Sequence, residues 1–441
     1  MSRTDCPYVD CREAKVTANA AVCPGCKRWL NRCGKCRTPN RSFANYCRSC
    51  GKGLPVLNEF WPASRGGAQR LSFSRQAAPV TLPDMKVEEI KVLRFSGRCR
   101  SLLAEDGYLF VVSDSGIIQV VDLNRIETEP YTFNVGGKIF AEPAVHAGTL
   151  YVGFLEDDTR DRGVVAAYTL GDITGSQPGV KLRWSLDLEG RPVQGLLPFG
   201  DRLYLNIGFK NARREIQYIE NIGKENPSKP LTVDDGERIS TLAANPPTGK
   251  VFFLSQKDSR LFVNIFDHSQ GPHPEMESSQ INGAPADFLE HIPAAVMGAK
   301  LFAVFGEQKH LCRIDTHSSS FDIKICAGVR NFALSGMSRQ VIVNTTGIFS
   351  TIGNLQEDLI RGEGIVSGPV ITRENMVVVG MRDGKIRFYR ADNLAVQLDY
   401  QAFDADRKVL ALATFKDMIA AGSQVGEARL LRIGPAGARA G

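Results

Sequence analysis

The cysteines of this chain are distributed so unevenly that they divide it into two parts. Eight of the 11 cysteines lie between Cys6 and Cys50, whereas Cys99, Cys312 and Cys326 are scattered over the remaining residues. A segment this short has little hydrophobic core, and thiolates are strong ligands for zinc, so metal binding can supply the missing folding energy. The sequence therefore predicts a small metal-stabilised unit followed by a much larger one.

The eight clustered cysteines form four pairs. Three pairs have the spacing C-x-x-C and the first has the looser spacing C-x4-C; the pairs are Cys6/Cys11, Cys23/Cys26, Cys33/Cys36 and Cys47/Cys50. Two residues between thiolates let both sulfurs face one point, and glycines such as Gly25 and Gly34 permit the tight turn. Four thiolates around zinc leave no position for a catalytic water, so we expect two structural zinc ions and no catalytic residue here.

The order of the pairs favours a sequential grouping. The first ion would be held by Cys6, Cys11, Cys23 and Cys26, and the second by Cys33, Cys36, Cys47 and Cys50. The loops between paired turns are then long enough for a short β-hairpin. A crossed grouping, as in interleaved zinc modules, remains open, and the spacing alone does not exclude iron–sulfur ligation. A redox pair of the thioredoxin type is disfavoured, because it needs one C-x-x-C beside a βαβ unit.

Residues 6–54, which end in Tyr46-Cys47-Arg48-Ser49-Cys50-Gly51-Lys52, resemble the double zinc ribbon family. The resemblance is closer for the second ribbon than for the first, because C-x4-C departs from the usual turn. It implies a small recognition module for protein or nucleic acid. We refer to residues 1–54 as the head.

Positive charge is concentrated at this end of the chain. Residues 1–70 carry 13 Lys and Arg but 4 Asp and Glu, whereas the whole chain has a formal net charge of +6. Interleaved basic and aromatic residues are one footprint of nucleic-acid binding, which makes such a partner possible through Lys27, Arg28, Arg32, Arg37, Arg41 and Arg48. The alternative, which we favour, is that these residues surround a small zinc core and offset the charge of its thiolates.

Residues 55–85 are rich in Gly, Ser, Pro, Ala and Arg and have no sustained periodicity, which predicts a flexible linker. No run approaches the roughly 18 apolar residues of a membrane helix, so we expect no membrane association. The first residues, Met1–Cys6, have no apolar run behind a basic start, so we expect no secretory signal. These features predict a cytoplasmic protein, in a reducing compartment where cysteines bind metal rather than form disulfides.

From residue 86 the pattern changes to short apolar and β-branched runs separated by Gly, Asp and Asn turns, without helical periodicity. A pair of strands around a tight turn recurs eight times; the pairs begin near residues 108, 149, 202, 250, 300, 340, 376 and 417. Another apolar segment precedes each pair, and a fourth strand usually follows. Four strands in about 40–45 residues is the period of a β-propeller blade.

The strands left over at the two ends of the repeat region support a closed ring. The final unit, Val409–Gly434, supplies three strands, and Val87–Phe95 supplies one strand before the first unit. Together they complete a blade. The predicted fold class is therefore all-β: a double zinc ribbon, and a β-propeller over residues 86–434 closed by N- and C-terminal strands. We predict eight blades, with seven as the alternative, and a disordered tail at 435–441.

Residues 86–434 resemble the PQQ-like and WD-repeat propellers, and Lys181-Leu182-Arg183-Trp184 is similar to the strand that ends PQQ-type repeats. The resemblance makes a quinoprotein enzyme the main catalytic alternative, but no calcium-ligand set or vicinal cysteine pair accompanies it. Catalytic signatures of hydrolases, zinc proteases and P-loops are also missing from the sequence. We therefore expect no catalytic residue and a non-enzymatic scaffold or adaptor, which binds protein partners through the propeller rim and the zinc head.

Overall fold

The structure is a computed structural model of the 441-residue chain. It describes residues 3–5, 15–17, 30–33, 35–41, 49–50, 71–72, 85–105, 107–156, 163–170, 179–188, 193–208, 214–236, 238–245, 249–268, 274–282, 294–297, 300–305, 308–316, 320–326, 329, 331–335, 340–344, 348–352, 355–360, 364–372, 376–390, 396–415 and 417–435. Within these residues, no helix is long and apolar enough to cross a bilayer.

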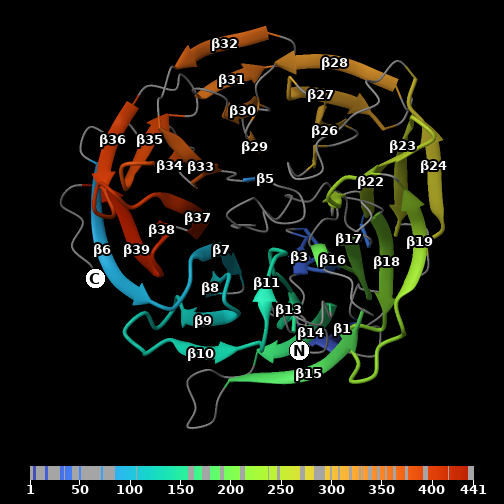
Figure 1. The fold of residues 1–441 in the computed structure, drawn as a ribbon. Helices are drawn as coiled ribbons and strands as arrows, with labels where there is room; N and C mark the ends of the chain where they lie inside the picture. Colours follow the sequence, from blue (N-terminus) through green and yellow to red (C-terminus); the bar gives the residue numbers. More distant parts are fainter. Residues whose placement is uncertain are drawn as a thin grey trace.

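Antiparallel sheets of four or five strands follow one another around a central axis (Figure 1). Eight such sheets occur in the described part of the chain; in seven of them the chain runs from the axis to the rim, and the eighth takes its rim strand, β6, from before the first blade. The molecule is therefore an all-β propeller. The prediction of eight blades rather than seven is confirmed.

In blades 1 to 4 the strands follow one another from the axis outward. Blade 1 contains β7 (Cys99–Glu105), β8 (Tyr108–Ser113), β9 (Ile117–Asp122) and β10 (Tyr131–Asn134). Blade 2 contains β11 (Lys138–Ile139) and β12 (Ala144–His146), then β13 (Thr149–Leu155), β14 (Gly163–Leu170) and β15 (Val180–Asp187). Blade 3 contains β16 (Val193–Phe199), β17 (Arg202–Gly208), β18 (Arg214–Glu220) and β19 (Leu231–Gly236). Blade 4 contains β20 (Arg238–Ile239) and β21 (Ala243–Asn245), then β22 (Lys250–Lys257), β23 (Arg260–Asp267) and β24 (Met276–Gln280).

Blades 5 to 8 follow the same order. Blade 5 contains β25 (Ala295–Met297), β26 (Lys300–Phe305), β27 (His310–Asp315) and β28 (Ser320–Cys326). Blade 6 contains β29 (Asn331–Ser335), β30 (Gln340–Asn344), β31 (Ile348–Ile352) and β32 (Leu355–Ile360). Blade 7 contains β33 (Ile365–Ile371), β34 (Met376–Met381), β35 (Lys385–Arg390) and β36 (Val396–Gln401). Blade 8 contains β37 (Val409–Phe415), β38 (Met418–Ser423), β39 (Glu427–Pro435) and β6 (Met85–Arg94).

The hydrophobic core consists of layers between neighbouring blades rather than one central mass. One layer joins blades 1 and 2 and contains Phe110, Ile118, Val152 and Ala166. Because each second strand is covered on both faces, β13, β34 and β38 are almost wholly buried and apolar, and β17 is wholly buried although it carries Arg202 and Asn206. The outer strands β10 and β36 instead alternate between half-buried and exposed positions, as expected of a strand with one face in water.

Glycines in the second strands let neighbouring blades approach closely. A Cβ atom at Gly153 would lie 2.6 Å from Cβ of Val193, the first residue of the next blade. Gly380 meets Val409 in the same way, and Gly422 meets Cys99. In blades 1, 3, 7 and 8 the inner strand also has a bulge directly after this first residue. The bulge bends the strand and sharpens the local twist, so this contact is a repeated feature of the ring.

The ring is closed by strands from opposite ends of the chain. The blue strand β6 pairs antiparallel with the red strand β39, with Glu427 opposite Arg94 and Pro435 opposite Met85 (Figure 1). β6 takes the place that β10 and β36 have in blades 1 and 7. In all three blades the residue after the outer strand donates its N–H to a glycine with positive φ; the donor and acceptor pairs are Val135 and Gly116, Ala402 and Gly384, and Phe95 and Gly426.

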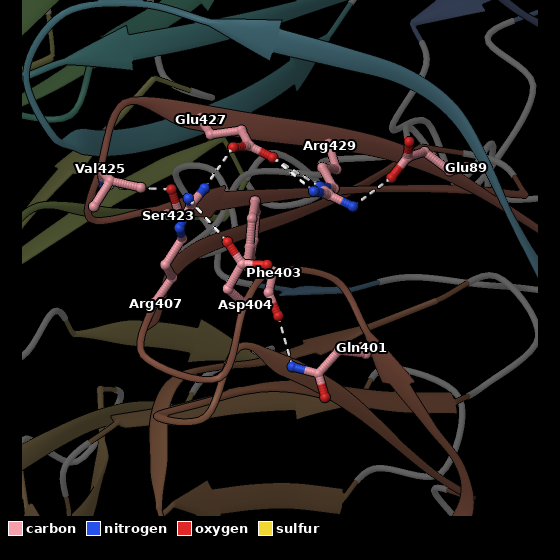
Figure 2. A network of polar contacts seen from close by, with 9 residues as sticks. All are labelled: Glu89, Gln401, Phe403, Asp404, Arg407, Ser423, Val425, Glu427 and Arg429. Atoms are coloured by element: carbon pink, nitrogen blue, oxygen red, sulfur yellow. Dashed lines mark hydrogen bonds and ion pairs between the residues drawn. The ribbon is translucent and has the colours of Figure 1, made fainter.

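A network of charged side chains joins the closing strands to the preceding blade (Figure 2). Arg429 of β39 donates to Glu89 of β6 at 2.7 Å and to Glu427 at 2.9 Å. Glu427 also accepts, at 2.9 Å, from Arg407, which lies in the connection from blade 7. The Glu427 side chain is only 9% exposed, so its carboxylate is shielded from bulk water where it accepts from both arginines, whose side chains are 32% and 25% exposed.

One short strand outside the propeller joins a blade at the axis. β5 (Leu71–Ser72) pairs parallel with the innermost strand of blade 6, so that Leu71 lies opposite Leu334 and Ser72 opposite Ser335. Figure 1 shows β5 beside β29 near the centre of the ring. These residues fall within the segment predicted as a linker.

The described part of the head contains two small antiparallel ladders. β1 (Arg3–Asp5) pairs with β2 (Lys15–Thr17), and β3 (Leu30–Arg32) pairs with β4 (Pro39–Arg41). The second ladder carries Cys33 and Cys36 in its connection, as expected for a metal-binding turn on a hairpin. The residues of the predicted tail after Pro435 lie outside the described part.

We predict that Glu427→Gln destabilises the propeller by about 1–3 kcal/mol, because it leaves two arginines without their shared carboxylate. The matched control is Asp404→Asn. Asp404 also pairs with Arg407, at 2.9 Å, but its side chain is 69% exposed, so its loss should cost less than about 1 kcal/mol. Equilibrium unfolding followed by circular dichroism measures both, and equal losses would contradict this role of Glu427.

Candidate metal centre

The hairpin of β3 and β4 forms a tight turn around Cys33. The backbone N–H of Cys33 donates to the carbonyl of Thr38 at 3.2 Å, and the N–H of Arg37 donates back to the carbonyl of Cys33 at 2.9 Å. The N–H of Lys35 points at Sγ of Cys33, 3.4 Å away. A backbone donor aimed at a sulfur stabilises the thiolate form, which is the form that binds metal.

Arg37 directly follows the second cysteine of this turn and has a φ of 59°. That left-handed conformation is the one that glycine adopts without steric cost, whereas an arginine brings its Cβ close to the backbone. The chain therefore accepts some conformational strain to bring Cys33 and Cys36 to the same side. The sequence did not reveal this position, because the glycine of the pair, Gly34, precedes Cys36.

Cys50 joins the same cluster from a segment further along the chain. Its Sγ lies 3.5 Å from Sγ of Cys33, and the sulfurs of Cys33, Cys36 and Cys50 all lie within 4.8 Å of one another. Sulfurs around a tetrahedral zinc, each about 2.3 Å from the ion, are about 3.8 Å apart. A disulfide needs about 2.05 Å. The spacing therefore fits three ligands of one metal ion.

The three sulfurs differ in their access to water. Cys33 is buried, Cys50 is half-buried and Cys36 is exposed, with its Sγ 3.2 Å from the Thr38 hydroxyl. Three thiolates make a soft donor set of the kind that zinc prefers over calcium or magnesium. These three cysteines can hold one metal ion, and zinc would contribute folding energy to a segment with little core.

The structure thus brings together three of the four cysteines predicted for the second ion. Cys47 lies outside the described residues, as do all four cysteines predicted for the first ion: Cys6, Cys11, Cys23 and Cys26. The two-ion arrangement and the sequential grouping remain predictions. Of the six basic residues considered for nucleic acid, the structure describes only the side chain of Arg37, which is exposed.

The propeller cysteines have a different environment. Cys99 and Cys312 are both buried within layers between blades. Burial in apolar surroundings raises the pKa of the Cys99 thiol well above its usual range, and nearby Asp114 adds to the effect. Cys99 therefore stays a protonated packing group rather than a thiolate ligand.

No protein-family model matches the chain, and a comparison with curated sequences found no match. Solved structures do match its fold. The computationally designed Ika8 protein has a TM-score of 0.58 and 12% identity, over 78% of this chain and 99% of that one. BamB from Moraxella catarrhalis has a TM-score of 0.52 and 12% identity, over 79% of this chain and 98% of that one.

A quinohemoprotein alcohol dehydrogenase, ADHIIG from Pseudomonas putida HK5, has a TM-score of 0.58 and 9% identity, over 86% of this chain and 81% of that one. These similarities support the resemblance to PQQ-like propellers. At such low identity they establish the fold and no activity.

We predict that Cys33→Ser lowers the metal content of the purified chain by one ion, because the buried sulfur at the centre of the turn is lost. Elemental analysis gives the number of zinc ions per chain. Cys312→Ala is the matched control, since it removes a buried propeller thiol and should leave the metal content unchanged. An unchanged zinc content in the Cys33 variant would contradict a metal site at this cluster.

Arg37→Gly should strengthen metal binding, since glycine accepts the left-handed conformation without strain. A gain of about 1 kcal/mol in the free energy of metal binding corresponds to a roughly fivefold lower rate of metal loss to a competing chelator, when the rate of metal binding is unchanged. Lys35→Gly is the control, because it removes the same charge one position before Cys36 but does not occupy a residue with positive φ. If the two variants lose metal equally fast, strain at Arg37 does not limit the site.

Proposed function

We propose that this protein is a non-enzymatic scaffold or adaptor that binds protein partners through its propeller and its metal-holding head. The supporting observation is the pairing of β5 with β29. The innermost strand of a blade presents a row of backbone N–H and C=O groups toward the axis, and such an edge readily accepts another strand. In this chain a segment from outside the propeller occupies it.

Strand addition is a common mode of peptide recognition. Main-chain hydrogen bonds supply affinity and alternate side chains supply specificity. In the described residues, the inner strands β7, β16, β25, β33 and β37 each end their sheet at the axis. A rigid ring with several such edges, together with the loops of its rim, offers surfaces on which partners can assemble.

The head adds a second contact to this proposal. A zinc ion held by cysteines alone is structural, so the head would serve as a small folded recognition module rather than a reactive centre. Two modules in one chain raise each other's effective concentration when both bind the same assembly. We include a cytoplasmic location in the proposal, because a reducing compartment keeps these thiols available to metal.

The enzymatic alternative is a quinone-dependent oxidoreductase, and the fold alone does not separate it from a scaffold. Elemental analysis and an absorption spectrum of the protein purified from its own cells distinguish the two. The scaffold proposal expects zinc without calcium or a quinone chromophore. Bound quinone with calcium would overturn the non-enzymatic assignment.

The main test is to isolate the native protein by a C-terminal tag under gentle lysis and to map contacts by cross-linking and mass spectrometry. The proposal expects stoichiometric protein partners, with cross-links to both the propeller and the head. A Cys33→Ser, Cys36→Ser double variant should lose the cross-links to the head and keep those to the propeller. A partnerless monomer at native concentration would contradict the proposal.

A further inference from the structure

The junction between blades 3 and 4 departs from a pattern that four other junctions share in the described part of the ring. In five described blades, the residue at the end of the third strand donates its backbone N–H to the carbonyl of the turn between the first two strands. These five equivalent residues are Leu123, Leu170, Ile222, His268 and Ile433. Four are aliphatic, and His268 of blade 4 is the exception.

The aliphatic residues at this position share a core layer with the third residue of the second strand in the preceding blade. Leu170 packs against the layer that contains Phe110, and Ile222 lies in the layer of Tyr151. Ile433 and Val378 share a core layer in the same way. The corresponding residue before His268 is Tyr204, which is fully buried.

His268 and Tyr204 form a hydrogen bond in place of this apolar contact. The Tyr204 hydroxyl lies 2.7 Å from Nε2 of His268. The imidazole also packs on the ring of Phe199 at 4.8 Å and lies beside Gly200. A buried polar pair between two blades is held in place because leaving either group unpaired would cost free energy.

Arg202 makes a second polar contact across the same junction. Its side chain is 4% exposed and donates to Glu220 at 2.7 Å, while its guanidinium lies 4.1 Å from the centre of the Tyr218 ring. Its Nη1 also donates to the carbonyl of Pro274 at 3.3 Å, just before β24. Blade 3 therefore holds blade 4 at the end of β23 and at the start of β24.

We propose that Tyr204, His268 and Arg202 form a proton-sensitive clamp between blades 3 and 4, which is closed while His268 is neutral and loosens when His268 is protonated. A second positive charge at His268 would lie close to the buried guanidinium of Arg202. It would also have to be desolvated between two packed blades.

The charged groups around His268 are already paired. Asp267, its neighbour on β23, is held by Lys250 of β22 at 3.2 Å, and Glu220 of β18 is held by Arg202. His146 of β12 lies nearby, with its Nε2 3.2 Å from the carbonyl oxygen of Gly200. Burial is the main cause that lowers the pKa of His268 from 6.5 to about 4, Arg202 lowers it further, and Asp267 partly opposes them.

The lowered pKa of His268 determines how the stability of the closed clamp changes with pH. Since the pKa of His268 is lower in the closed clamp than in an open one, the neutral form stabilises closure, and this contribution is fully present above pH 6.5. It is lost as the pH falls toward 4. The equilibrium constant for closure should then fall by at most about 300-fold, which corresponds to the full shift of the pKa.

The test compares the full-length wild type with His268→Leu, which introduces the residue type that blade 2 has at the equivalent position. Urea unfolding between pH 7 and pH 4 gives the stability difference between the two proteins. The wild type should lose at least about tenfold in its folding equilibrium constant relative to His268→Leu over this range. His310→Gln, which removes a half-buried histidine of blade 5, should behave as the wild type.

Two further measurements locate the effect. Side-chain NMR should give His268 a pKa near 4, and hydrogen exchange near Asp267 and Met276 should rise in acid in the wild type but not in His268→Leu. Tyr204→Phe, which removes only the hydroxyl, should raise this exchange at pH 7. The proposal is overturned if His268 titrates at about 6 or above, or if His268→Leu responds to acid as the wild type does.

Discussion

The pairing of β6 with β39 is the interaction on which the rest of the propeller depends. A blade has two apolar faces, and each is buried only against a neighbouring blade. An open ring would therefore leave one face of its first blade and one face of its last blade in water. The chain avoids this by completing blade 8 with Met85–Arg94, a strand from before the first blade. The charged network of Glu89, Arg429, Glu427 and Arg407 then ties the joint to the neighbouring blade.

Much of this architecture was predictable from local sequence patterns. The paired strands around tight turns predicted eight blades, and the leftover strands at Val87–Phe95 and Val409–Gly434 predicted the closure. What could not be predicted depends on contacts between residues far apart in the chain. Gly422 looks like a weak strand residue until Cys99 is found packed against it, and nothing local marks Leu71–Ser72 as a partner of β29.

The metal centre also combines features that the sequence predicted with features that it could not predict. Spacing alone paired Cys33 with Cys36 and assigned Cys50 to the same ion, and the structure brings their sulfurs together. The left-handed conformation of Arg37 and the Lys35 N–H aimed at sulfur are consequences of the folded turn, so they had no counterpart in the spacing. The polar pair of Tyr204 and His268 was likewise invisible, because its meaning comes from comparison with equivalent junctions of the ring.

The most direct test of the account compares two shortened chains by calorimetry: one beginning at residue 85 and one beginning at residue 96. The first keeps β6 and should unfold in one cooperative transition near the temperature of the full chain. The second lacks the closing strand and should lose that transition or unfold at a much lower temperature, since the outer strand is gone and Arg429 has lost its partner Glu89. Equal melting of the two chains would contradict a ring closed by its two ends.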